Sequence, residues 1–166
     1  HFLLLTSPDA PGPLSTAVNV SHRRVAAAAN GPGTMWWLPR CSDLTGVDLF
    51  HATFNILPAG LAMPSLTTVH DLMWLESPDL CETGWSGALK ARFFSHGITR
   101  ALARSTALAC VSEATRATVI ARQPDAASRC FVTADTKKAA VGVMLAAAGL
   151  FGPEGFGAKR GNKVRL

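Results

Sequence analysis

The stretch SLTTVHDLMWL, residues Ser65–Leu75, indicates the fold of this chain. Its first five residues, Ser65–Val69, are apolar or β-branched, a composition typical of a strand buried in a sheet. The run ends abruptly in His70 and Asp71. In an open sheet of parallel strands, ligands bind at the carboxyl ends of the strands. We therefore expect a buried strand that delivers His70 and Asp71 to the edge of a crevice.

Outward from this strand, strand-like and helix-like segments alternate. The clearest helix is Gly87–Arg104, where Phe94, Ile98 and Leu102 recur every four residues. A second helix is expected after Ser112, a favourable N-cap, and should end near Arg122, before Pro124. The region Ala17–Asn30 could form a helix followed by a short strand, but its pattern does not determine its secondary structure. Further strands are predicted at Phe2–Leu5, Thr34–Arg40, Val47–Phe50, Thr106–Val111 and Arg129–Thr133.

This alternation predicts an α/β fold: a Rossmann-like open, mostly parallel sheet with helices on both faces. We expect one such domain over residues 1–133 and an Ala/Gly-rich basic tail over residues 134–166. The apolar run Ala139–Phe151 is shorter than the roughly 20 residues of a membrane-spanning helix, so we interpret it as a core or interface helix. The chain begins at His1 without an initiator Met or a signal-peptide pattern, and we expect it to be a fragment.

Composition narrows the functional classes. Hydrophobic residues make up 48% of the chain, which indicates a globular protein. The net charge is +5, but the basic residues are scattered and not interleaved with aromatics, so we expect no nucleic-acid partner. A basic helix face could still meet anionic phosphates or lipid head groups. The four cysteines form no CxxC pair, so we expect no metal site and interpret them as reduced cysteines of a cytoplasmic protein.

Polar side chains follow three of the predicted strands. Such residues have structural explanations too: His70 could bond a loop carbonyl, Asp71 could form a turn, and Ser112 could serve only as a helix cap. A hydrolase triad is disfavoured because no G-x-S-x-G elbow occurs. If the strands are parallel neighbours, these side chains share one rim. They are His51 and Thr53, His70 and Asp71, and Ser112 and Glu113.

The block from Gly46 to Thr133 resembles the N-terminal, acceptor-side domain of family 4 glycosyltransferases, which have the GT-B fold. The resemblance lies in four motifs that occur in the family's order, over roughly half of the chain. They are GVDLFHATFNILPAGL, PSLTTVHDLMWLESPD, ARFFSHGITRALARS and ALACVSEATRATVI.

The resemblance implies retaining transfer of a sugar from a nucleotide-sugar donor to a glycan or lipid-linked acceptor, without an essential metal ion or cofactor. It implies that His70 is the catalytic residue facing the reaction centre and that Asp71 orients its loop. It also implies a cytoplasmic enzyme that can contact the inner face of the membrane peripherally. The substrate-binding residues implied are His51, Thr53, Asp71, Ser112, Glu113, Thr115 and Arg116.

The chain also departs from the family pattern. No Gly-rich acceptor loop is evident in TSPDAPGPLST, and the donor-binding C-terminal GT-B domain, which needs about 150 residues, is missing. The tail contains PEGFG with Glu154, but Asn162 occupies the position of the second glutamate of the family's donor site. We therefore expect weak or no activity from this chain alone. The alternative hypothesis is a non-enzymatic, Rossmann-like binding or assembly module.

Overall fold

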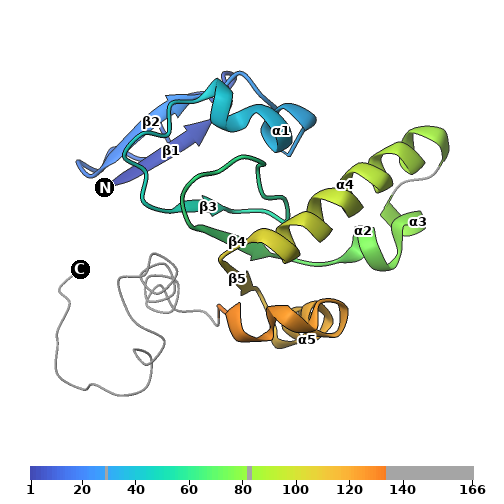
Figure 1. Ribbon diagram of the computed structural model, residues 1–166. Coiled ribbons are helices and arrows are strands. Elements are labelled where there is room, and N and C mark those ends of the chain that lie inside the picture. The colour runs from blue at the N-terminus through green and yellow to red at the C-terminus, as the bar shows by residue number, and fades with distance from the viewer. Residues whose placement is uncertain (29, 82–83, 134–166) are drawn as a thin grey trace, which may run out of the picture. The chain divides into compact units, whose positions relative to one another are not determined.

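The structure is a computed structural model that describes residues 1–28, 30–81 and 84–133 (Figure 1). The chain forms two compact units, and each is described by itself. The first contains His1–Gly46 together with Pro58–Leu61. The second contains Val47–Leu57 and the described residues from Ala62 onward. The predicted helix Ala139–Phe151 and Glu154 lie outside the described residues.

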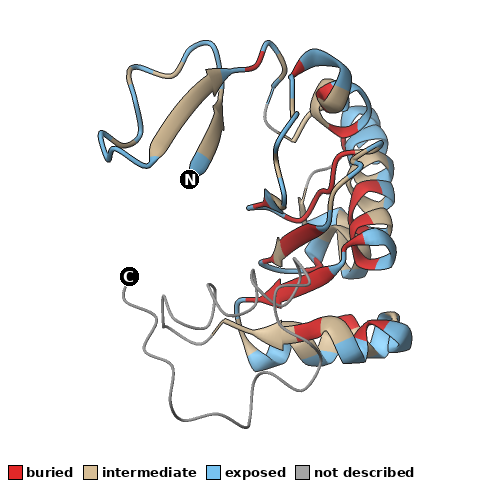
Figure 2. Cartoon of the chain, turned by 60° about the vertical axis from the view of Figure 1, so that its left-hand side comes forward, coloured by how far each residue is buried: buried red, intermediate tan, exposed pale blue. Residues whose placement is uncertain are grey.

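The second unit is built on four parallel strands in the order β3-β4-β5-β6. Figure 2 shows β4 and β5 as largely buried. The central strands of a parallel sheet are normally buried, which explains the apolar character of SLTTV and ALAC. The bounds are β3 Phe50–Ala52, β4 Ser65–Val69, β5 Ala107–Cys110 and β6 Cys130–Val132. The predicted α/β class with a parallel sheet is confirmed.

Helices connect these strands because parallel neighbours require crossover connections. They are α2 (Met73–Glu76), α3 (Pro78–Cys81), the long α4 (Gly84–Arg104), α5 (Glu113–Arg122) and the 3₁₀ helix η1 (Pro124–Arg129). The predicted ends of α4 and α5, at Arg104 and Arg122, are confirmed.

The main core lies on one face of the four-stranded sheet. There Leu108 and Cys110, alternate residues of β5, pack in one cluster with Ile98 and Leu102 of α4 and with Val119 of α5. The strands β4, β5 and β6 are neighbours in chain order. Because their crossover connections have the same handedness, the connecting helices lie on the same face of the sheet. On the opposite face, Leu66, Ala107 and Ala109 form a separate cluster with Phe131. In the described part of this unit, α4 and α5 both pack on the first face. A helix layer over the opposite face therefore stays a prediction.

β3 begins later than predicted. The expected strand was Val47–Phe50, but pairing with β4 starts only at Phe50, opposite Ser65. Gly46 has a positive φ of 75°, which turns the chain before the strand, and the Phe50 N–H donates to the Pro64 carbonyl. As a result His51 lies inside β3 and not after its end.

The first unit contains a two-stranded parallel sheet and one helix. β1 (Phe2–Thr6) pairs with β2 (Val20–Arg24). The centre of the region Ala17–Asn30, whose secondary structure the sequence left open, is therefore a strand. The prediction of a strand at Thr34–Arg40 is wrong, because α1 (Pro32–Cys41) covers these residues.

The sequence of α1 explains this correction. Pro32 lies at the start of the helix, where its fixed φ suits the first turn and its missing N–H costs nothing. Met35 and Leu38 are buried while Trp37 is exposed, a spacing of three that suits a helix and not a strand.

Pro39 lies inside α1 and has no N–H to donate to the carbonyl of Met35, four residues earlier. The Ala59 N–H donates to that carbonyl instead, at 2.6 Å. The segment Pro58–Leu61 thus completes the backbone hydrogen bonds of α1, which explains why it belongs to the first unit.

Among the described residues, no helix combines the length and the apolar composition needed to cross a bilayer.

Candidate functional site at the carboxyl edge of the four-stranded sheet

The carboxyl ends of β3, β4 and β5 lie side by side. Val69 pairs with Cys110, so β4 and β5 end level, and the Val111 N–H donates to the Val69 carbonyl at 3.1 Å. β3 ends two residues earlier, with Ala52 opposite Thr67. The residues that follow these ends therefore meet at one edge of the sheet, as parallel strands require.

The imidazole of His70 is exposed at this edge and held by its neighbours. Nε2 lies 3.0 Å from the carbonyl oxygen of Thr53, and the ring packs against Phe54 with the centroids 5.3 Å apart. A carbonyl oxygen only accepts hydrogen bonds, so this contact places a proton on Nε2. Nδ1 is then the acceptor of the neutral ring. The arrangement presents a positioned hydrogen-bond acceptor at the edge of the sheet.

Asn55 fixes the main chain at His70, and sequence reasoning missed it. Its side chain is only 2% exposed. Oδ1 accepts a hydrogen bond from the His70 N–H at 2.8 Å, and Nδ2 donates to the Asp71 carbonyl at 3.0 Å. A polar residue in the apolar run FNILP was the available signal, because a buried amide requires partners.

Asp71 acts as a turn former in this structure. Its Oδ1 accepts a hydrogen bond from the Met73 N–H at 3.0 Å, at the start of α2. This contact orients the chain as it leaves β4 and leaves the carboxylate exposed. The structural interpretation of Asp71 is thus supported by geometry, while its role toward a substrate stays a prediction.

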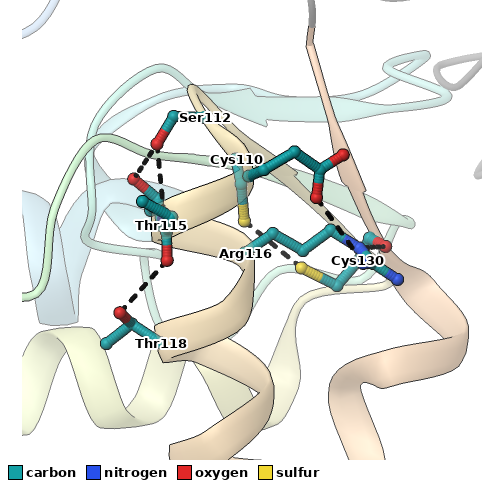
Figure 3. Close-up of polar contacts among 8 residues, drawn as sticks. Cys110, Ser112, Thr115, Arg116, Thr118 and Cys130 are labelled. Carbon is teal, nitrogen blue, oxygen red and sulfur yellow. Dashed lines mark hydrogen bonds and ion pairs between the residues drawn. The ribbon is translucent and has the colours of Figure 1, made fainter.

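Ser112 caps α5 and contacts Thr115 (Figure 3). Thr115 in turn contacts the backbone of His70. The Ser112 Oγ accepts a hydrogen bond from the Thr115 N–H at 3.1 Å, and the two hydroxyl oxygens lie 3.0 Å apart. Thr115 Oγ1 donates its single proton to the His70 carbonyl at 3.2 Å. The Ser112 hydroxyl must therefore donate to Thr115 Oγ1. The cap and the His70 backbone form one hydrogen-bond chain.

Arg116 and Glu113 extend from the first turn of α5. Arg116 Nε donates to the Cys130 carbonyl at 3.2 Å, and its Nη1 lies 3.8 Å from Glu113 Oε2 (Figure 3). The guanidinium thus joins α5 to β6. The Glu113 side chain is 79% exposed, so the ion pair contributes little. The substrate-binding roles of both residues stay predictions.

His51 and Thr53 have different contacts, and of the two only Thr53 is in contact with His70. His51 Nε2 lies 2.9 Å from Thr68 Oγ1 on the neighbouring strand. Desolvation lowers the pKa of His51, so the ring favours its neutral form. Thr53 contributes its backbone carbonyl to His70, and its role as a substrate-binding residue stays a prediction.

Two buried cysteines lie behind the edge. Cys110 and Cys130, on the adjacent strands β5 and β6, have their sulfur atoms 3.2 Å apart and are both free thiols. Burial, and secondarily the hydrogen bond with Cys130, raises the pKa of Cys110 far above its usual value. A thiol held protonated is a poor nucleophile and a poor metal ligand. Over residues 1–28, 30–81 and 84–133 no three His, Cys, Asp or Glu side chains gather as metal ligands.

A shallow depression between α2 and α5 contains none of the predicted site residues. It is lined by Glu76, Ala117, Thr118, Ala121 and Arg122.

No family model, curated protein or solved structure matches the chain.

Proposed function

We propose that this chain is the acceptor-side half of a glycosyltransferase of the GT-B type, similar to family 4, with a Rossmann-like sheet as its scaffold. Its second unit supports this proposal by having a four-stranded parallel sheet. Its motif order supports it as well, since the motifs at Gly46, Pro64 and Ala107 contribute β3, β4 and β5 in the family's sequence.

The observation that carries the proposal is the exposed imidazole of His70 at the carboxyl edge, whose Nε2–H donates a hydrogen bond to the Thr53 carbonyl. The remaining acceptor, Nδ1, suits a sugar hydroxyl, which is a hydrogen-bond donor. The backbone on both sides of the ring is held by Asn55 and Thr115. A group positioned in this way loses little freedom when it binds a substrate.

Transfer from a nucleotide sugar also requires stabilisation of the leaving diphosphate by cations or backbone N–H groups. At this edge Arg116 is engaged with the Cys130 carbonyl and Glu113. We infer that a second, C-terminal GT-B domain supplies the diphosphate contacts and most of the donor selectivity. The expected donor is a nucleotide sugar, and the expected acceptor is a glycan or lipid-linked sugar at the cytoplasmic face of the membrane. The 166-residue chain alone should then be weakly active or inactive.

The test is transfer of radiolabelled sugar from a panel of nucleotide sugars by the whole gene product. His70→Ala should lower turnover by at least about 100-fold, the range lost with a general acid-base or orienting group. His22→Ala is the matched control, because His22 belongs to the first unit and accepts a hydrogen bond from the Leu14 N–H. It should keep wild-type turnover.

Circular dichroism of His70→Ala separates loss of chemistry from loss of fold. Full transfer by a folded His70→Ala variant would refute the role of this histidine. Absence of transfer from every nucleotide sugar would favour the alternative, a non-enzymatic binding or assembly module.

A further inference from the structure

Phe54 is an exposed aromatic residue at the start of a buried segment. The four residues that follow it, Asn55–Pro58, are all buried, whereas Phe54 stays 39% exposed. Burial of a phenylalanine ring is one of the larger favourable contributions to folding. A single exposed apolar residue needs no explanation by itself. Phe54 differs because its ring is in contact with the exposed imidazole of His70, at the carboxyl edge of the sheet.

The main chain is fixed on both sides of Phe54. On one side, the Thr53 carbonyl accepts a hydrogen bond from His70 Nε2 at 3.0 Å. On the other side, the Asn55 side chain accepts from the His70 N–H at 2.8 Å and donates to the Asp71 carbonyl at 3.0 Å. These contacts leave the backbone of Phe54 little freedom. A ring that is positioned before the ligand arrives loses little conformational entropy when the ligand binds.

Phe54 and His70 together present an aromatic surface beside a hydrogen-bond acceptor. Their ring centroids lie 5.3 Å apart with the planes tilted by 32°, and the contact leaves part of Phe54 in water. The acceptor is Nδ1 of His70, because Nε2 carries the proton. A pyranose ring matches both groups. The hydrogens on its ring carbons suit the negative face of an aromatic ring, and its hydroxyl groups donate hydrogen bonds.

We propose that Phe54 and His70 form a subsite for one pyranose ring of the acceptor, with the ring's C–H face on Phe54 and a hydroxyl donating to Nδ1 of His70. Phe54 then contributes to specificity, because a lipid chain has no hydroxyl to satisfy the acceptor beside it. The assignment rests on the proposed function in naming this sugar as the acceptor of a transfer reaction. It adds that this edge recognises a sugar ring of the acceptor and not its lipid.

The test is saturation-transfer NMR with the full chain and without any nucleotide sugar. The probes are methyl α-D-glucopyranoside, methyl α-D-mannopyranoside and methyl β-D-galactopyranoside. Uridine is included because a nucleobase also stacks on an aromatic ring. At least one glycoside should bind, with the strongest saturation on the hydrogens of its ring carbons. Titration of that signal gives the Kd of each variant.

Substitutions of Phe54 separate stacking from packing. Phe54→Leu keeps an apolar side chain beside His70 but removes the aromatic face, so it should weaken glycoside binding roughly fivefold. Phe54→Ala should weaken it by about tenfold or more, since apolar contact is lost too. Phe54→Trp keeps an aromatic face and should bind at least as tightly as the wild type. Phe2→Ala is the matched control, because Phe2 is 48% exposed but belongs to the first unit, and it should bind normally.

Three results would overturn the subsite: no glycoside bound by the wild type, wild-type affinity in Phe54→Leu and Phe54→Ala variants that circular dichroism shows to be folded, or tighter binding of uridine than of every glycoside. The last result would assign Phe54 to a nucleobase. Glycoside binding that depends on Phe54, combined with no transfer by the whole gene product, would retain the subsite and reject the transferase. Transfer that Phe54→Leu leaves unchanged would retain the transferase and reject the subsite.

Discussion

The side-chain amide of Asn55 spans the peptide that joins His70 and Asp71. Its Oδ1 accepts from the His70 N–H at 2.8 Å, and its Nδ2 donates to the Asp71 carbonyl at 3.0 Å. One buried side chain after β3 thus fixes the backbone after β4. The position of the His70 ring depends on this bridge as well as on its own contact with Thr53.

Asn55→Ala should lower the free energy of unfolding by about 2 kcal/mol, because it removes two partly buried hydrogen bonds, each worth about 1 kcal/mol. Asn55→Asp should also destabilise, since a carboxylate cannot donate to the Asp71 carbonyl. Urea denaturation measures both. Asn19→Ala, at an exposed position, is the control. Equal stability of Asn55→Ala and wild type would contradict the bridge.

Ser112→Ala should destabilise the protein by about 1 kcal/mol through loss of the cap on α5. Thr115→Val keeps the N–H that Ser112 accepts but removes the donor to the His70 carbonyl. It should therefore loosen the loop after β4, seen as faster amide exchange at His70 and Asp71. Unchanged exchange in Thr115→Val would show that the hydrogen-bond chain does not hold this loop.

Arg129 stabilises the carboxyl end of α4. Its Nη1 donates to the Ser105 carbonyl at 2.7 Å, and its Nη2 donates to the Leu102 carbonyl. Arg129→Lys should lower the free energy of unfolding by roughly 1.5–3 kcal/mol, because an ammonium cannot reproduce the fork that reaches both carbonyls. Thermal unfolding compares it with Arg122→Lys, an exposed arginine in the last turn of α5. The prediction fails if the two variants have the same melting temperature.

Because of His51, the free energy of unfolding should fall in mild acid. Its pKa is lowered in the folded chain by desolvation, so the folded state binds its proton less readily than the unfolded state. The stabilising contribution is complete above the unfolded pKa of about 6.5 and is lost as pH falls from there to the folded pKa. His51→Gln should reduce the pH dependence of the unfolding midpoint in this range. An identical pH dependence in the variant would locate the effect elsewhere.

Cys110 should resist alkylation in the native protein. Burial raises the pKa of its thiol, and Cys130 raises it further, so little thiolate forms. Cys41 is exposed and should react first with iodoacetamide. Mass spectrometry over time should show Cys110 labelled only as the protein unfolds in urea. Labelling of Cys110 at the rate of Cys41 would contradict the buried position.

The parts of the fold that sequence could predict are those determined locally. Ser65–Val69 was identified from its apolar and β-branched side chains, and Ser112 from the preference of a helix start for a hydroxyl acceptor. Both signals lie within a few residues. The hydrogen bonds of the Ser112–Thr115 pair are likewise local.

The parts that sequence could not predict depend on distant residues. The run TMWWLPR was interpreted as a short strand ended by Pro39. Burial of Met35 and Leu38 and the donor from Ala59 instead allow a helix with an internal proline. Asn55 was missed for the same reason. Its partners follow a different strand, and only the sheet brings them together.

The hydrogen bond from Ala59 to Met35 also constrains the order of folding during synthesis. α1 ends at Cys41, but the donor for its Met35 carbonyl is translated 18 residues later, after β3. The backbone hydrogen bonds of α1 therefore cannot be completed on the ribosome until residue 59 has left the exit tunnel. A polypeptide cut after Gly46 would carry that unpaired carbonyl permanently, so limited proteolysis that isolates this unit should need to retain Pro58–Leu61.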